Sequence, residues 1–107
     1  MAREIAERDW KVFRELRAVA LERFCERTIG EIERLAADSK KSWHDRYLAI
    51  YKKLDRRDEE LANAFNDARR STAFLRLAQI RGLGLLSDEE MARFGQETQS
   101  IVRGLLS

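Results

Sequence analysis

The chain has 107 residues, of which 44% are hydrophobic and 37% charged, with a net charge of +2. This composition favours one folded domain over residues 1–107 and excludes the low hydrophobicity of disordered chains. It also excludes a membrane span, because no apolar run approaches the roughly 20 residues required. The single cysteine and the lack of a signal-peptide pattern predict a cytoplasmic protein.

The first predicted element is a helix over residues 3–37, rich in alanine, leucine, glutamate and arginine. Its apolar residues recur every three or four positions, but the apolar face rotates midway. Ile5, Phe13 and Leu16 lie on one face, whereas Phe24 and Ile32 lie on a rotated one. We therefore expect the two halves of this helix to pack against different neighbours.

The second predicted element is a helix over residues 42–81, after a polar turn at residues 37–42. Ser42 followed by Asp45 resembles a capping box, and an apolar stripe runs from Tyr47 to Leu75. Six consecutive charged residues at 55–60 interrupt the stripe, so a kink or a break is an alternative there, although the stripe resumes in phase at Leu61.

The third predicted element is an amphipathic helix over residues 88–105. Ser87 and Glu90 have the spacing of a capping box, and Leu86 is placed to pack against Met91 as a hydrophobic staple. In the preceding segment, either Gly82 or Gly84 suits the left-handed position that ends a helix.

Together these elements predict an all-α fold: a long, antiparallel, coiled-coil-like hairpin with a short C-terminal helix. Two helices cannot bury both faces of the first helix, so we expect a homodimer that completes a helical bundle. The apolar residues around the end of the second helix are the predicted interface, or else a site for another protein. They are Phe74, Leu75, Leu77, Ile80, Leu83, Leu85 and Leu86.

The sequence offers little for catalysis, and we expect no enzymatic activity, no cofactor and no metal site. One histidine and one cysteine do not make a ligand cluster, and the Glu-x-x-His pattern of di-iron bundles is absent.

Cys25 falls in an apolar sector, which favours a buried, inert thiol. His44 is expected to be a partly exposed packing residue. Trp43, Tyr47 and Tyr51 are expected to pack in the core, the alternative being a ligand pocket between them.

Basic residues suggest a second function, since residues 38–86 carry a net charge of +4. A basic face opposite the apolar stripe of the second helix is a candidate nucleic-acid surface, formed by Lys52, Lys53, Arg56, Arg70 and Arg81. Acidic residues interrupt this face, and the third helix begins with SDEE, which repels phosphates. We therefore favour a helical interaction or regulatory protein over a nucleic-acid-binding one.

Overall fold

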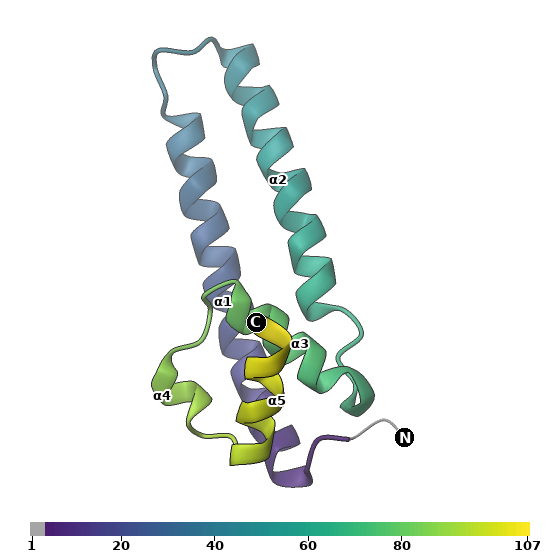
Figure 1. Cartoon of the computed structure of the whole chain (residues 1–107). Coiled ribbons are helices and arrows are strands. Elements are labelled where there is room, and N and C mark those ends of the chain that lie inside the picture. Colours follow the sequence, from purple (N-terminus) through teal and green to yellow (C-terminus); the bar gives the residue numbers. More distant parts are fainter. Residues whose placement is uncertain (1–3) are drawn as a thin grey trace.

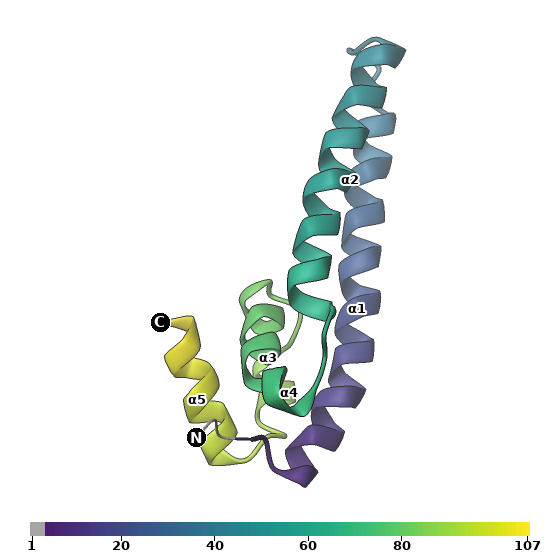
Figure 2. The ribbon, with the colours of Figure 1, turned by 90° about the vertical axis from the view of Figure 1, so that its right-hand side faces the viewer.

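The structure, a computed structural model, describes residues 4–107, which form helices and no strand (Figure 1). The helices α1 (Glu7–Ala36) and α2 (Trp43–Phe65) form the long antiparallel hairpin expected from the sequence. The short helices η1 (Arg70–Thr72), α3 (Ala73–Gly82), α4 (Asp88–Met91) and α5 (Gln96–Leu106) follow. They gather at one end of the hairpin, and the other end extends beyond them (Figure 2). The molecule is consequently elongated, measuring 54 × 27 × 24 Å.

The first helix largely follows its predicted course. Residues 4–6 precede α1, and Arg3, where we expected the helix to begin, lies outside the described residues. The expectation of two different neighbours is confirmed, because α1 contacts both α2 and α3. No helix within residues 4–107 is long and apolar enough to cross a membrane.

The prediction of one helix over residues 42–81 is wrong. The charged run at 55–60 is helical throughout, and α2 ends further on, at Phe65. Asn66 has an extended backbone, and Asp67 adopts the left-handed conformation with a φ of 58°. Asparagine and aspartate tolerate such turn conformations better than other residues with side chains. The Thr72 hydroxyl then donates to the carbonyl of Asp67 at 2.6 Å, which fixes the turn that leads into α3.

The third predicted helix is divided in two, so its expected span of 88–105 is also wrong. The capping box is confirmed: the Ser87 hydroxyl accepts from the Glu90 amide, and the Glu90 carboxylate accepts from the Ser87 amide. The helix that follows ends at Met91, and α5 begins after Gly95. The carboxylate of Asp9 accepts the Gly95 amide hydrogen at 3.1 Å and the Thr98 hydroxyl hydrogen at 2.6 Å. Asp9, from the start of α1, therefore caps α5 across 86 residues of sequence.

The hydrophobic core lies at the base of the molecule, where the short helices cover one end of the hairpin. The phenyl ring of Phe24 on α1 meets that of Phe65 on α2 edge to face, with centroids 6.0 Å apart. The largest fully buried side chains come from α1, α2, α3, α5 and the segment after α3: Phe13, Phe65, Leu77, Ile80, Leu85 and Val102. This core fixes the orientation of the hairpin relative to the base.

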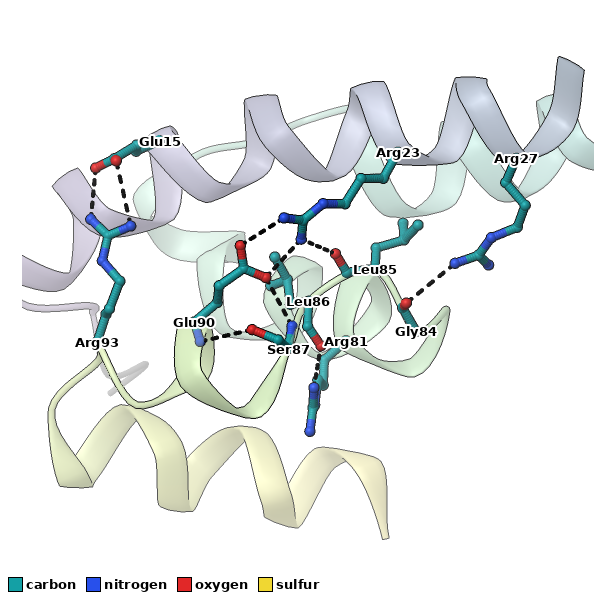
Figure 3. A network of polar contacts seen from close by, with 10 residues as sticks. All are labelled: Glu15, Arg23, Arg27, Arg81, Gly84, Leu85, Leu86, Ser87, Glu90 and Arg93. Atoms are coloured by element: carbon teal, nitrogen blue, oxygen red, sulfur yellow. Dashed lines mark hydrogen bonds and ion pairs between the residues drawn. The ribbon is translucent and has the colours of Figure 1, made fainter. Parts of the chain in front are cut away.

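Arginines of α1 hold the segment between α3 and α4 in place (Figure 3). The Arg23 guanidinium donates to the Leu85 carbonyl at 2.9 Å and to both carboxylate oxygens of Glu90 at 2.7 and 2.9 Å. Arg27 donates to the carbonyls of Leu83 and Gly84. Gly84 has a φ of 73°, so it is the glycine in the left-handed position after α3.

Candidate interaction surface

The distal part of the hairpin, residues 29–63, contains no buried residue. This segment, which we call the distal hairpin, comprises the end of α1, the connecting turn and most of α2. Its two helices contact each other along one seam, and none of the short helices extends along it (Figures 1 and 2). Most of its surface therefore faces solvent in a single chain.

Ion pairs close one side of the seam. The Arg57 guanidinium donates to both carboxylate oxygens of Glu31 at 3.0 and 2.8 Å, and to Glu60 at 2.8 Å. The Lys53 ammonium lies 3.3 Å from Glu31. The hydrogen bonds from Arg57 are the main reason that the pKa of Glu31 falls to about 2. This half-buried cluster joins α1 to α2 where apolar packing is thin.

On the other side of the seam, the distal hairpin exposes a row of large apolar side chains. Trp43, Tyr47 and Tyr51 are exposed by 80%, 67% and 63%, so the expectation that they pack in the core is wrong. Leu54 on α2 and Ile29 on α1 extend the row, with exposures of 47% and 58%. We call these five residues the aromatic strip. Monomeric proteins seldom leave such a continuous row uncovered.

The three aromatic residues of the strip diverge from the seam because of their spacing. Residues four apart are rotated by about 40° around a helix, so Trp43, Tyr47 and Tyr51 turn progressively away from α1. Residues seven apart stay close to one direction, and Ile50, Arg57 and Ala64 accordingly keep the half-buried or buried positions against α1.

A shallow groove of about 230 Å³ lies at the basal end of the aromatic strip, between α1 and α2. Its lining is mostly apolar and comprises Phe24, Cys25, Thr28, Ile29, Leu54, Arg57, Asp58 and Leu61. The Thr28 side chain is buried, with 8% exposure, and its hydroxyl has no hydrogen-bond partner among the described residues. A buried hydroxyl without a partner costs about 1–3 kcal/mol. We call this hollow the Thr28 groove.

The tip of the hairpin is held by Arg46. Its guanidinium donates to the carbonyls of Ala36 and Lys41 at 3.2 and 3.0 Å, which satisfies main-chain acceptors at the end of α1 and in the turn that follows. The same guanidinium lies 4.3 Å from the centroid of the Trp43 ring. This cation–π contact orients the first aromatic side chain of the strip.

The interface proposed from the sequence lies at the base of the molecule. Leu77, Ile80, Leu85 and Leu86 are buried within the core of the single chain. Phe74 and Leu83 are partly buried against the same core, whereas Leu75 is 47% exposed. Four of the seven predicted interface residues are thus buried by their own chain and do not form an exposed surface.

The basic residues proposed from the sequence do not share one helix. Lys52, Lys53 and Arg56 lie on α2, but Arg70 lies in η1 and Arg81 in α3. Arg70 pairs with Glu7, Arg81 with Asp88, and Lys53 with Glu31. The basic face predicted along one long helix is therefore wrong, since that helix ends at Phe65.

The single cysteine and histidine lie apart. Cys25 is half-buried at the Thr28 groove rather than fully buried, and His44 is exposed in the first turn of α2. Within residues 4–107, no three histidine, cysteine, aspartate or glutamate side chains are placed to hold a metal ion.

Comparison with protein-family models, curated proteins and solved structures finds no match for this chain. Its function is therefore inferred from the surface chemistry described above.

Sequence reasoning missed one feature of this surface, the Thr28 groove. Its apolar residues were assigned to the apolar faces of the first and second predicted helices, and Asp58 to a charged run. The spacing of Trp43, Tyr47 and Tyr51 was the available signal, because a strict i, i+4 run drifts off any straight seam.

Proposed function

We propose that the protein is a non-enzymatic helical interaction protein that binds a protein partner through the distal hairpin. The observation that carries this proposal is the aromatic strip, which leaves Trp43, Tyr47 and Tyr51 largely in solvent. Tryptophan and tyrosine are enriched at the centres of protein interfaces, where each buries a large area with little loss of side-chain freedom. A cytoplasmic location, favoured by the single cysteine, belongs to the same proposal.

The arrangement of the molecule supports this role. The base has its own core and holds the hairpin through Phe24, Phe65 and the arginine contacts of α1. Binding surfaces built on helices held by a packed core lose little freedom when a partner binds. The base thus presents the aromatic strip in a fixed orientation.

Photo-cross-linking tests the proposal directly. A benzophenone amino acid replaces Tyr47 in the full chain, and Lys52, rotated by about 140° around α2, serves as the control position. In the cells that make the protein, we expect discrete adducts from position 47 and few from position 52. Equal labelling from the two positions, or none from position 47, would contradict the proposed function.

Nucleic-acid binding through Lys52, Lys53, Arg56, Arg70 and Arg81 is the alternative prediction. The dispersal of these side chains over three elements gives it no support beyond net charge. We expect no gel shift with duplex DNA or RNA at low salt. A shift that weakens with salt and is lost in the Lys52→Glu/Arg56→Glu variant would favour the alternative instead.

A further inference from the structure

We propose that the partner of the aromatic strip is a second copy of this chain, which lies antiparallel across it. In this arrangement the Tyr47 ring of each copy enters the Thr28 groove of the other. The inference rests on the proposed function, because it names the occupant of the same surface.

The chemistry of the groove suits a tyrosine side chain. Its walls are apolar, from Ile29, Leu54 and Leu61, and they suit an aromatic ring. The lining also includes Thr28, whose buried hydroxyl has no hydrogen-bond partner among the described residues, and Asp58, which is exposed. A phenol hydroxyl both donates and accepts a hydrogen bond, so one tyrosine satisfies the apolar walls and a polar group together.

The positions of the groove and of Tyr47 fit a twofold axis. Both lie on the exposed side of α2, and Tyr47 precedes Asp58 by eleven residues, or about 16 Å along the helix. A twofold axis that crosses α2 between Lys52 and Lys53 places each Tyr47 beside the partner's Asp58. Tyr51 then meets the partner's Leu54. The contact is isologous, so two identical insertions close the assembly at a dimer.

The charge of α2 favours the antiparallel direction. Residues 43–53 carry a net charge of +2, and residues 54–65 carry a net charge of −2. Antiparallel helices place each half against the oppositely charged half, whereas parallel helices would align like charges. The helix dipoles oppose each other favourably in the same arrangement.

The size of the surface predicts a weak dimer. The sixteen residues 43–58 of α2 extend about 24 Å along the helix, and the two helices of the hairpin are together about 20 Å wide. The product of these dimensions gives a contact area of roughly 500 Å² per copy. The total of about 1,000 Å² lies near the lower end for specific interfaces. We expect a dissociation constant in the micromolar range and therefore a mass that rises with concentration.

Sedimentation equilibrium of the full chain provides the first test. We expect a monomer–dimer equilibrium that Tyr47→Glu weakens at least tenfold, because the new carboxylate meets the partner's Asp58. Leu48→Glu is the matched control, because residue 48 lies about 100° further around α2 and leaves the dissociation constant unchanged. A chain that stays monomeric into the hundred-micromolar range overturns the inference, as does a dimer that Tyr47→Glu leaves intact.

A double-mutant cycle tests the groove itself. Tyr47→Phe and Thr28→Val each remove one hydroxyl, and each is expected to raise the dissociation constant about three- to tenfold. If these hydroxyls form a hydrogen bond with each other across the interface, the dimer of the double variant has the same dissociation constant as the dimers of the single variants. If the effects of the two substitutions on the free energy of dimerisation simply add, the proposed hydrogen bond between Tyr47 and Thr28 is overturned.

The native thiol at the groove reports the direction of pairing. With diamide as the oxidant, Tyr47→Cys should form a disulfide with Cys25 of the other copy and yield a covalent dimer. Within one chain the two positions are roughly 16 Å apart along the hairpin, too far for a disulfide. Leu48→Cys is the control. Adding Cys25→Ser to Tyr47→Cys abolishes the covalent dimer, whereas a disulfide that joins the two introduced thiols at position 47 would show parallel pairing and overturn the inference.

The two proposals fail differently. Adducts from position 47 to a different protein, with a chain that sediments as a monomer, would retain the proposed function and overturn the homodimer. Failure to form any adduct from position 47 would remove both.

Discussion

Several arginine side chains in this protein donate to main-chain carbonyls at helix ends. Arg17 reaches the carbonyl of Phe65 and Arg76 that of Asn63, both at the end of α2. Arg46 similarly reaches Ala36 at the end of α1. The last carbonyls of a helix have no partner within the helix, and a guanidinium satisfies them while complementing the negative end of the dipole. In the sequence alone, the same arginines resemble those of a solvated basic surface.

The left-handed glycine after α3 makes a first prediction at the scale of one residue. Gly84→Ala should lower the free energy of unfolding by about 1–2 kcal/mol, because a side chain disfavours its φ of 73°. The matched control is Gly30→Ala, within α1, where the added methyl meets only the Arg34 guanidinium at 3.7 Å. That change should raise the stability by roughly 0.5–1 kcal/mol. Urea unfolding measures the stability of both variants. If both substitutions raise the free energy of unfolding, or both lower it, the left-handed role of Gly84 is contradicted.

The contact between Arg23 and Glu90 makes the stability of the protein dependent on pH. Hydrogen bonds from Arg23 and then from the Ser87 amide lower the pKa of Glu90 from 4.5 to about 2. A carboxyl whose pKa is lower in the folded state stabilises the fold above pH 4.5, and this contribution is lost as the pH falls from 4.5 towards 2. Urea unfolding across this window should show falling stability.

Substitution separates this contribution from those of other carboxyls. Glu90→Gln should reduce the slope of stability against pH between 4.5 and 2, whereas Glu89→Gln, at the exposed neighbouring residue, should retain the wild-type slope. An unchanged slope in Glu90→Gln would show that other groups account for the acid sensitivity. Glu31, whose pKa is also about 2, should respond in the same direction.

At the scale of elements, the position of α5 depends on the cap from Asp9. The Asp9 carboxylate is buried, accepts from the Gly95 amide and from the Thr98 hydroxyl, and lies at the positive end of the helix. Asp9→Ala should destabilise the protein by about 1–3 kcal/mol. Asp9→Asn should cost less, because its side-chain oxygen still accepts a hydrogen bond.

Thermal and urea unfolding measure these changes, with Lys11→Ala, exposed on the same helix, as the control. Hydrogen exchange should also show faster exchange in α5 of the Asp9→Ala variant, because its first turn loses its acceptor. Unchanged stability in that variant would mean that packing alone holds α5.

The sequence predicts most of the fold because its signals are local. The capping box at Ser87, the apolar period of α1 and the polar turn before Trp43 each involve residues within a few positions. The end of α2 was missed because the apolar period continues in phase past Phe65, and the break depends on a turn built by Asp67 and Thr72. The break before α5 depends on Asp9, 86 residues away. The spacing of apolar residues and the helix propensity of a segment carry no information about such distant partners.

The candidate site is less predictable than the fold for a related reason. A helical period identifies which residues share a face but not which neighbour covers it. Tyr47 was assigned to the core because it belongs to a stripe that does reach the core at Phe65. Whether the stripe is buried at each level depends on where the short helices pack, and they reach only the base.

At the scale of the whole molecule, the apolar core and the candidate site occupy different ends. All buried residues that the structure describes lie within residues 5–28 and 64–102, whereas the distal hairpin has none. Local stability follows the burial of apolar contacts, so the two ends are expected to open with different free energies. Binding at the aromatic strip would then stabilise mainly the distal hairpin.

Hydrogen exchange measured along the chain tests this division. In dilute solution, amides of residues 43–58 should exchange faster than those of the core-facing part of α1 around Phe13 and Phe24, because distal openings expose little apolar surface. As the protein concentration rises through the dimer dissociation constant, protection should increase in residues 43–58 and change little at the base. The Tyr47→Glu variant should lose this concentration dependence, while Leu48→Glu retains it. Uniform protection at all concentrations would contradict both the local stability gradient and the covering of the strip by a second chain.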